Sequence, residues 1–360
     1  MENYLTEAQL NAQLHTLIAS ISDLDEESIE QIQKRLDSLT KPQGSLGQLE
    51  SLAKQLGGIQ RTSHPKILKK AVLLMAGDHG VAADGVSAFP QEVTPQMVYN
   101  IIGGGAAINV LARHANAEVF CTDVGVAFPL EGDIIHKRVA NGTQNMTKGP
   151  AMTRQQALQA LLVGAEVADE KIRAGYNLLA TGDLGIGNTT PSSAIVALFT
   201  NSVIESVVGR GTGIDDAGLI KKRHAIEKAI ELNQPNPQDA LDVLTKVGGL
   251  EIAAIAGSIL QAAASRVPIV IDGFISTAGA LIAAKLAPKS TAFMIPSHGS
   301  AEIGHRKALE ALGLDPLFNL HMRLGEGTGA ALTFHLVEAA LHILEEMSTF
   351  ADAGVSEQSI

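Results

Sequence analysis

Five short apolar segments, each followed by polar or glycine-rich residues, most constrain how this chain can fold. They are residues 71–76 (AVLLMA), 118–122 (EVFCT), 177–181 (NLLAT), 268–271 (PIVI) and 291–295 (TAFMI). Stretches with helical patterns lie between them, so strands and helices alternate along the chain. This alternation is typical of a parallel sheet covered by helices. The sequence therefore predicts an α/β fold.

Capping signals place the starts of two of these helices. Thr94 and Pro95 are expected as the N-cap and first residue of a helix that runs to about residue 113. Thr153 and Gln156 have the spacing of a capping box and predict a long helix after them. Both chain ends read as helical without strands of their own, over residues 5–59 and about 327–347. We expect these ends to form a separate small lobe.

The polar residues that follow the strands predict where a ligand binds. In open parallel sheets, ligands bind beyond the carboxyl ends of the strands. The expected strands place the following residues on that rim: Asp78, His79, Asp123, Asp183, Asp272, Ser297 and His298.

Charge and composition exclude several classes of protein. The net charge of −11 argues against nucleic-acid binding, which needs a basic face. The single cysteine, Cys121, allows no internal disulfide and fits a reducing compartment. The first residues do not have the pattern of a secretory signal, and no apolar run is long enough for a membrane span. We therefore expect a cytoplasmic protein that binds neither nucleic acid nor membrane.

Two glycine-rich segments are candidates for binding a phosphate. Residues 182–190 (GDLGIGNTT) follow a strand and precede a helix, where backbone N–H groups and the helix dipole favour an anion. Residues 209–213 (GRGTG) precede a helix that carries Lys221, Lys222 and Arg223. Each has a plainer interpretation: an ordinary strand-to-helix turn for the first, and a flexible turn before a solvated basic face for the second.

Three further segments carry side chains that suit catalysis or binding. Glu326, between glycines in residues 323–329 (RLGEGTG), suits a general base, or it is a charge that complements a helix start. Ser300 suits a helix cap or a phosphate donor, whereas a lone His298 is more often structural than a metal ligand. The loop after residue 76 offers an apolar wall that includes Phe89 and Pro90, and its Asp78-His79 pair is a weak metal signal.

Taken in order, these motifs resemble one enzyme family. They are residues 41–47 (KPQGSLG), 78–80 (DHG), 185–191 (GIGNTTP), 233–237 (NQPNP), 246–249 (KVGG), 272–274 (DGF), 296–298 (PSH) and 323–327 (RLGEG). Together they closely resemble the nicotinate-nucleotide–dimethylbenzimidazole phosphoribosyltransferases of cobalamin biosynthesis, over about residues 30–345. Each motif alone is unspecific, but the ordered set is highly specific.

The resemblance implies an architecture and a set of site residues. It implies a homodimer with a Rossmann-like parallel sheet in a large domain, residues 61–327, and a small helical domain from residues 1–60 and 328–360. It implies Glu326 as the catalytic base and no metal or other cofactor. Asp183 stands where the family often has glutamate, with a role in orienting the nucleotide or supporting the base. The substrates would lie against Phe89, Pro90, Met97 and Leu324 for the azole and Gly211, Lys222 and Ser300 for the phosphate, with Gly185 and Asp272 nearby.

The implied reaction transfers 5-phosphoribose from nicotinate mononucleotide to 5,6-dimethylbenzimidazole. Three other functions remain open at this point. A phosphoribosyl-pyrophosphate-dependent transferase usually has two adjacent acids after a strand, whereas Asp183 stands alone. A non-catalytic azole-binding protein would not need the base Glu326. A nicotinamide dehydrogenase would need a Gly-x-Gly-x-x-Gly turn early in the chain, with an acid about 20 residues later, and none is found.

Overall fold

The centre of the molecule is a six-stranded parallel sheet, seen in a computed structural model that describes residues 5–356. Its strands are β1 (Lys70–Gly77), β2 (Ala117–Gly125), β3 (Ile135–His136), β4 (Leu178–Leu184), β5 (Ile269–Ile271) and β6 (Met294–Pro296). They lie in the order β3-β2-β1-β4-β5-β6, with β1 pairing to β2 on one side and to β4 on the other. This is the Rossmann order, whose chain direction across the sheet reverses between β1 and β4.

Helices cover both faces of the sheet. The helices of the described residues, including those that do not touch the sheet, are α1 (Glu7–Ala19), α2 (Glu26–Ser38), α3 (Gln48–Gln60), α4 (Val93–Ile102), α5 (Ala107–His114), α6 (Arg154–Arg173), α7 (Thr189–Thr200), α8 (Asp216–Asn233), α9 (Ala240–Val247), α10 (Leu250–Ala264), α11 (Phe274–Leu286), α12 (Ile303–Leu312), α13 (Thr328–Glu346) and α14 (Phe350–Ala353). Short 3₁₀ helices span Gly80–Asp84, Ile204–Ser206 and Pro288–Phe293. The predicted α/β fold with a helix-covered parallel sheet is confirmed.

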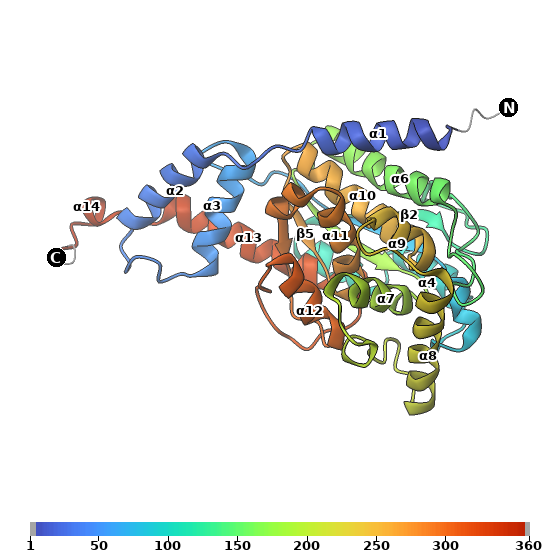
Figure 1. The fold of residues 1–360 in the computed structure, drawn as a ribbon. Coiled ribbons are helices and arrows are strands. Elements are labelled where there is room, and N and C mark those ends of the chain that lie inside the picture. Colours follow the sequence, from blue (N-terminus) through green and yellow to red (C-terminus); the bar gives the residue numbers. More distant parts are fainter. Residues whose placement is uncertain (1–4, 357–360) are drawn as a thin grey trace.

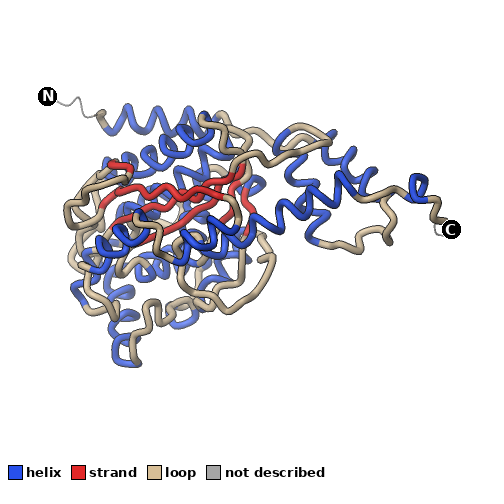
Figure 2. Tube along the Cα trace, turned by 180° about the vertical axis from the view of Figure 1, so that it is seen from behind, coloured by secondary structure: helices blue, strands red, loops and turns tan. Residues whose placement is uncertain are grey.

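The alternation of side chains along β1 divides the core into two parts. Successive strand residues point to opposite faces. Leu73 and Met75 therefore join the core beneath α6, α10 and α11, whereas Val72 and Leu74 join the core beneath α4, α5 and α13. Figure 1 shows α6 and α10 on the first side, and Figure 2 shows the sheet from the other side. All eight residues of β1 are buried, which explains its continuous apolar sequence.

A group of helices extends from one end of the sheet and joins the two chain ends. α2 and α3 pack together, and α13 runs from the sheet out to them (Figure 1). The Arg35 guanidinium of α2 donates to the Leu344 and Met347 carbonyls at the end of α13, at 3.3 and 2.8 Å. α1 instead packs against α6 and α10. The predicted division into a large domain, residues 61–327, and a small domain from the two chain ends stays a prediction. Within the segment 1–60 assigned to the small domain, α1 packs against α6 and α10, which cover the sheet.

Local sequence patterns predicted most of the helices and strands, but they did not predict all of their first and last residues. The capping box of Thr153 and Gln156 is present at the start of α6. The predicted strand at 291–295 is wrong in part, because Pro288 starts a 3₁₀ helix and only Met294–Pro296 pairs as β6. The two-residue strand β3 gives too short a pattern to predict.

The predicted helix from Thr94 to about residue 113 is also wrong in part. α4 ends at Ile102, and α5 begins only at Ala107. Gly104 between them has φ +78°, a conformation that ends a helix easily. Thr94 does not cap α4, whose N-cap is Glu92; its hydroxyl instead donates to the buried Asp78 carboxylate at 2.6 Å. A tertiary partner therefore replaced the local capping role.

Candidate active site

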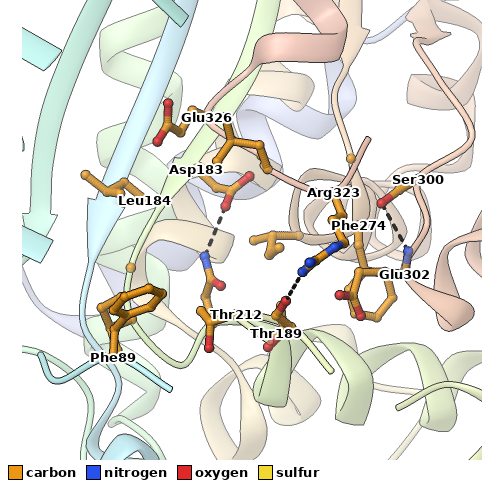
Figure 3. Close-up of a pocket in the computed structure, with 18 of the residues that line it drawn as sticks. Phe89, Asp183, Leu184, Thr189, Thr212, Phe274, Ser300, Glu302, Arg323 and Glu326 are labelled. Carbon is orange, nitrogen blue, oxygen red and sulfur yellow. Dashed lines mark hydrogen bonds between the residues drawn. The ribbon is translucent and has the colours of Figure 1, made fainter. Parts of the chain in front are cut away.

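A cavity of about 470 Å³ lies beyond the carboxyl ends of β4, β5 and β6. Loops after these strands, together with the segments near residues 89, 211 and 323, form its walls (Figure 3). Its position agrees with the rule that ligands bind near the point where the strand order reverses. Of the predicted site residues, the structure brings together around this cavity Phe89, Asp183, Gly185, Gly211, Ser300, Leu324 and Glu326.

Asp183, at the end of β4, is a buried carboxylate with an incomplete set of partners. Its Oδ2 accepts a hydrogen bond from the Asn188 side chain at 3.0 Å, and its Oδ1 is buried without a partner among the described residues. Burial raises the pKa of Asp183 well above its ordinary value, and the charges of Asp272 and Glu251 add to this effect. The site thus holds a second acid close to Glu326.

Glu326 sits in an uncommon backbone conformation. Gly325, Glu326 and Gly327 have φ values of +82°, +62° and +88°. A positive φ is uncommon for a residue with a side chain and often marks a functional site. The loop packs so closely that a Cβ on Gly327 would lie 2.6 Å from Val72 Cγ1, and one on Gly182 would lie 2.9 Å from the Glu326 carbonyl oxygen. The two flanking glycines therefore hold Glu326 against the sheet.

The electrostatic environment of Glu326 suits a general base. Burial raises the pKa of Glu326, the charge of Asp272 raises it further, and the Ile108 backbone amide opposes these effects. Its Oε2 is buried and has no hydrogen-bond partner within residues 5–356. A carboxylate with a raised pKa holds a proton more strongly and is a better base once ionised.

Asp272 lies behind Glu326 and does not line the cavity. Its Oδ2 accepts a hydrogen bond from the Gly327 amide at 3.1 Å and its Oδ1 one from the Ala330 amide at 3.0 Å. Only 1% of the residue is exposed. Asp272 therefore caps α13, a helix without a side-chain cap from its own segment, and holds the Glu326 loop in place.

The opposite end of the cavity carries donors suited to an anion. Gly211, with φ +52°, and Ser300 line it, together with Thr189 at the start of α7. Lys222 lies behind this wall, fully buried, and burial lowers the pKa of Lys222 to about 8 against the opposing charge of Glu302. The predicted phosphate residues are thus close together, but Lys222 does not face the cavity.

Apolar side chains surround the end of the cavity that lies away from the anion donors. Phe89, labelled in Figure 3, and Leu324 line the cavity. They remain 52% and 57% exposed, so they have apolar area available to cover a ring. Pro90 follows Phe89 in the chain, and Met97 packs from α4 against the core on that face of the sheet. Neither Pro90 nor Met97 lines the cavity.

Several residues that were expected at the ligand-binding rim instead form hydrogen bonds or ion pairs with other parts of the protein. Asp78 accepts hydrogen bonds from the Thr94 hydroxyl and from the Ala127 amide at 2.9 Å. Asp123 pairs with the Arg138 guanidinium at 2.7 Å. His79 Nε2 lies 2.8 Å from Glu251 Oε1, with both side chains buried. None of these residues lines the cavity.

Several polar residues in or near the cavity were not predicted as site residues from the sequence. Asn188 bonds Asp183, and the Arg323 guanidinium crosses the cavity wall to donate to the Gly211 carbonyl oxygen at 2.9 Å. Asn188 and Arg323 lie within the motifs at residues 185–191 and 323–327, so a polar side chain inside a family motif is the sequence feature that could have identified them. The signal for Glu251 is one acid in the otherwise apolar first turns of α10.

The described residues contain neither a membrane-spanning helix nor an evident metal site. Within residues 5–356, no helix is both long and apolar enough to cross a membrane. No group of three or more His, Cys, Asp and Glu side chains in this range is placed to hold a metal ion.

Known proteins resemble this chain over nearly its whole length. A family model described as phosphoribosyltransferase matches residues 21–355. A protein from Chloroflexus aggregans is 54% identical over 343 residues, covering 95% of this chain and 97% of its own. One from Desulforamulus reducens is 52% identical, covering 94% and 98%. Both are named nicotinate-nucleotide–dimethylbenzimidazole phosphoribosyltransferase.

Solved structures agree. A crystal structure from Thermus thermophilus bearing the same enzyme name superposes with a TM-score of 0.88 at 46% identity, covering 93% of this chain and 100% of that one. A second from the same organism, described as CobT, has a TM-score of 0.89 at 47% identity, covering 92% and 100%.

Proposed function

Because this chain belongs to the family of nicotinate-nucleotide–dimethylbenzimidazole phosphoribosyltransferases, we propose a mechanism in which Glu326 is the base. The protein is an enzyme, a pentosyltransferase of cobalamin biosynthesis that moves 5-phosphoribose from nicotinate mononucleotide to 5,6-dimethylbenzimidazole. Family membership selects this reaction from those the sequence left open. The observation that carries the mechanism is a buried glutamate, held between two glycines, at the edge of a half-apolar, half-polar cavity.

The reaction is a direct displacement at ribose C1′. The pyridine-like nitrogen of the benzimidazole forms a bond to C1′ as the C1′–nitrogen bond to nicotinate breaks. The electron pair of the broken bond returns to the nicotinate ring nitrogen, which loses its positive charge. The benzimidazole N–H proton passes to the Glu326 carboxylate, which is general base catalysis. Attack opposite the leaving group gives α-ribazole 5′-phosphate from a β-nucleotide.

The two ends of the cavity divide the substrates between them. The azole ring lies against Phe89 and Leu324, whose exposed apolar area it covers. Pro90 and Met97 support that wall from behind. Asp183 lines the cavity between the two ends, next to the ribose. Its pKa is raised by burial, and in the fraction of enzyme in which it is ionised its carboxylate stabilises the positive charge that develops on the ribose.

The nucleotide phosphate lies at the end lined by Gly211 and Ser300, with Gly185 beside it and the buried Lys222 ammonium behind Gly211. This fixes C1′ between the azole and Asp183. Asp272 contributes through the Glu326 loop. We also propose that the enzyme is a homodimer in the cytoplasm and needs no metal or other cofactor, as the resemblance implies. Light scattering tests the dimer, and activity in the presence of a chelator tests the metal.

A product assay tests the function and the base together. Purified protein is mixed with nicotinate mononucleotide and 5,6-dimethylbenzimidazole, and the products are followed by liquid chromatography. We expect nicotinate and α-ribazole 5′-phosphate from the wild type, and a rate lower by about 10²- to 10⁴-fold from Glu326→Gln. Glu310→Gln, an exposed glutamate on α12, is the matched control and should keep full activity.

The outcomes separate the two parts of the proposal. Absence of product with the wild type, despite tight azole binding, would leave a binding protein rather than an enzyme. Product at equal rates from the wild type and Glu326→Gln would keep the reaction and remove Glu326 as the base.

A further inference from the structure

The turn of residues 183–188, between β4 and α7, brings several groups to the cavity. Asp183, labelled in Figure 3, lines it together with Gly185, Ile186 and Asn188. The turn closes on itself, because the Asn188 side chain donates to Asp183 Oδ2 at 3.0 Å. The proposed displacement needs Asp183 at a fixed distance from the ribose. The contacts that hold this turn from outside therefore bear on the reaction.

The end of β1 supports the turn by close backbone contact. A Cβ added to Gly185 would lie 1.9 Å from the Gly77 carbonyl oxygen, so the turn lies directly against that strand. Gly187 has φ +92°, a conformation that suits glycine. Glycine has no side chain with which to form a bond. These residues therefore let the turn approach β1 without fixing its position.

A buried hydrogen bond joins the turn to helix α4. The Ile186 amide donates to Thr94 Oγ1 at 3.1 Å, and Thr94 is fully buried in the first turn of α4. An amide can only donate, so the threonine oxygen must be the acceptor. The single hydrogen of the Thr94 hydroxyl is donated to Asp78 Oδ1 at 2.6 Å. The chain thus runs in one direction, from Ile186 through Thr94 to Asp78.

Asp78 is a firm end point for this chain because its other polar groups are also bonded. Its Oδ2 accepts a hydrogen bond from the Ala127 amide at 2.9 Å. Its own amide donates to the Gly125 carbonyl oxygen at 2.8 Å, and its carbonyl oxygen accepts from the Thr143 amide at 2.9 Å. Hydrogen bonds in series strengthen one another in a buried, low-dielectric environment. The Thr94 hydroxyl is therefore held in one orientation.

We propose that Thr94 is a positioning residue for the transfer reaction, whose hydroxyl holds the turn of residues 183–188, and with it Asp183, at the correct distance from the ribose. The inference rests on the proposed function, because the role of Asp183 belongs to it. Thr94 acts through the Ile186 amide and does not line the cavity. Asp78 contributes by fixing the direction of the hydroxyl.

The test compares Thr94→Val with the conservative Thr94→Ser. Valine keeps the branched shape of threonine but removes the donor and the acceptor, whereas serine keeps both. Thr122→Val is the matched control. Thr122, on β2, is also fully buried, but its hydroxyl has no hydrogen-bond partner within residues 5–356. The control therefore removes a buried hydroxyl without removing a hydrogen bond.

Hydrogen exchange followed by mass spectrometry measures the anchor itself. Peptides that cover residues 183–190 should exchange about tenfold faster in Thr94→Val than in the wild type, because a buried hydrogen bond of the turn is lost. The same peptides should exchange at the wild-type rate in Thr94→Ser and in Thr122→Val. Unchanged exchange of these peptides in Thr94→Val would overturn the proposal. Equally faster exchange over β1 would also overturn it, because the effect would then be a general loss of stability.

Steady-state kinetics measures the consequence for the reaction. Thr94→Val should lower kcat by roughly 10- to 100-fold, because a small misplacement of a group beside the reacting atoms costs that much. The KM for the azole should stay within about twofold, since Phe89 and Leu324 lie on other segments. Thr94→Ser should keep most of the wild-type kcat. An unchanged kcat in Thr94→Val, or an equal loss in Thr94→Ser, would overturn the role of the hydroxyl.

Two further results are separated by the design. If Thr94→Val does not fold, as judged by thermal melting, Thr94→Ala replaces it in both measurements. If the wild type forms no product, the proposed function fails, while the exchange comparison still decides whether Thr94 anchors the turn.

Discussion

Replacing Asp272 by asparagine tests whether the active-site loop depends on a helix cap supplied by the residue that follows β5. The Asp272 carboxylate accepts hydrogen bonds from the Gly327 and Ala330 amides at 3.1 and 3.0 Å, and the residue is almost fully buried. Asparagine keeps one acceptor oxygen but presents an NH₂ group to the other amide. One hydrogen bond to a charged group is lost, and two buried donors are brought face to face.

The magnitude follows from these contacts. A hydrogen bond to a charged group is worth about 1.5–3 kcal/mol, and an unsatisfied buried donor costs about 1–3 kcal/mol. Removing the Asp272 charge offsets part of this loss, because that charge raises the pKa of both Asp183 and Glu326. We expect the free energy of unfolding to fall by about 2–4 kcal/mol. We also expect kcat to fall by about 10²-fold if the loop moves by about 1 Å.

The assay is urea unfolding combined with steady-state kinetics. Asp239→Asn is the matched control, because Asp239 also accepts two helix amides, at 3.0 and 3.1 Å, but on a half-exposed surface. Asparagine caps helices well, and the Asp239 ion pair with Arg154 is exposed, so the control should lose under about 1 kcal/mol.

Equal stability losses in Asp272→Asn and Asp239→Asn would refute the capping argument. An Asp272→Asn enzyme with unchanged stability and weakened binding of the nucleotide alone would instead show that Asp272 binds substrate.

Three further outcomes follow from the buried ionisable groups. Because burial raises the pKa of Glu326, the acidic limb of the kcat/KM profile should begin above the ordinary glutamate value of 4.5, and Glu326→Gln should abolish that limb. Burial also raises the pKa of Asp183, so between the unfolded and the folded pKa the folded protein keeps a proton on Asp183 that the unfolded chain has lost. The free energy of unfolding therefore falls as the pH rises through the folded pKa of Asp183. Asp183→Asn should therefore melt at a higher temperature than the wild type at neutral pH and should lose activity. The difference between the two melting temperatures should be smaller at acidic pH. Burial raises the pKa of Cys121 to about 12, so a thiol reagent should label it only after unfolding in urea.

The sequence by itself determined most of the elements and the general position of the site. Apolar runs such as residues 71–76 are strands because they are buried on both faces, and their alternation with helices requires a parallel sheet. The glycines around Glu326 and the ordered motifs pointed to the family, which the relatives confirm. These conclusions depend on local patterns and on their order along the chain.

Only the tertiary structure decided how the polar groups are used. Thr94 had a capping signal, yet its hydroxyl serves Asp78. The α13 cap comes from Asp272, which lies 55 residues before Gly327 in the chain. Lys222 was predicted beside the phosphate, and only the structure shows that its ammonium donates to the Thr189 hydroxyl. The physical reason is that a buried polar group must find a partner wherever packing brings one, and no local pattern records which distant residue that is.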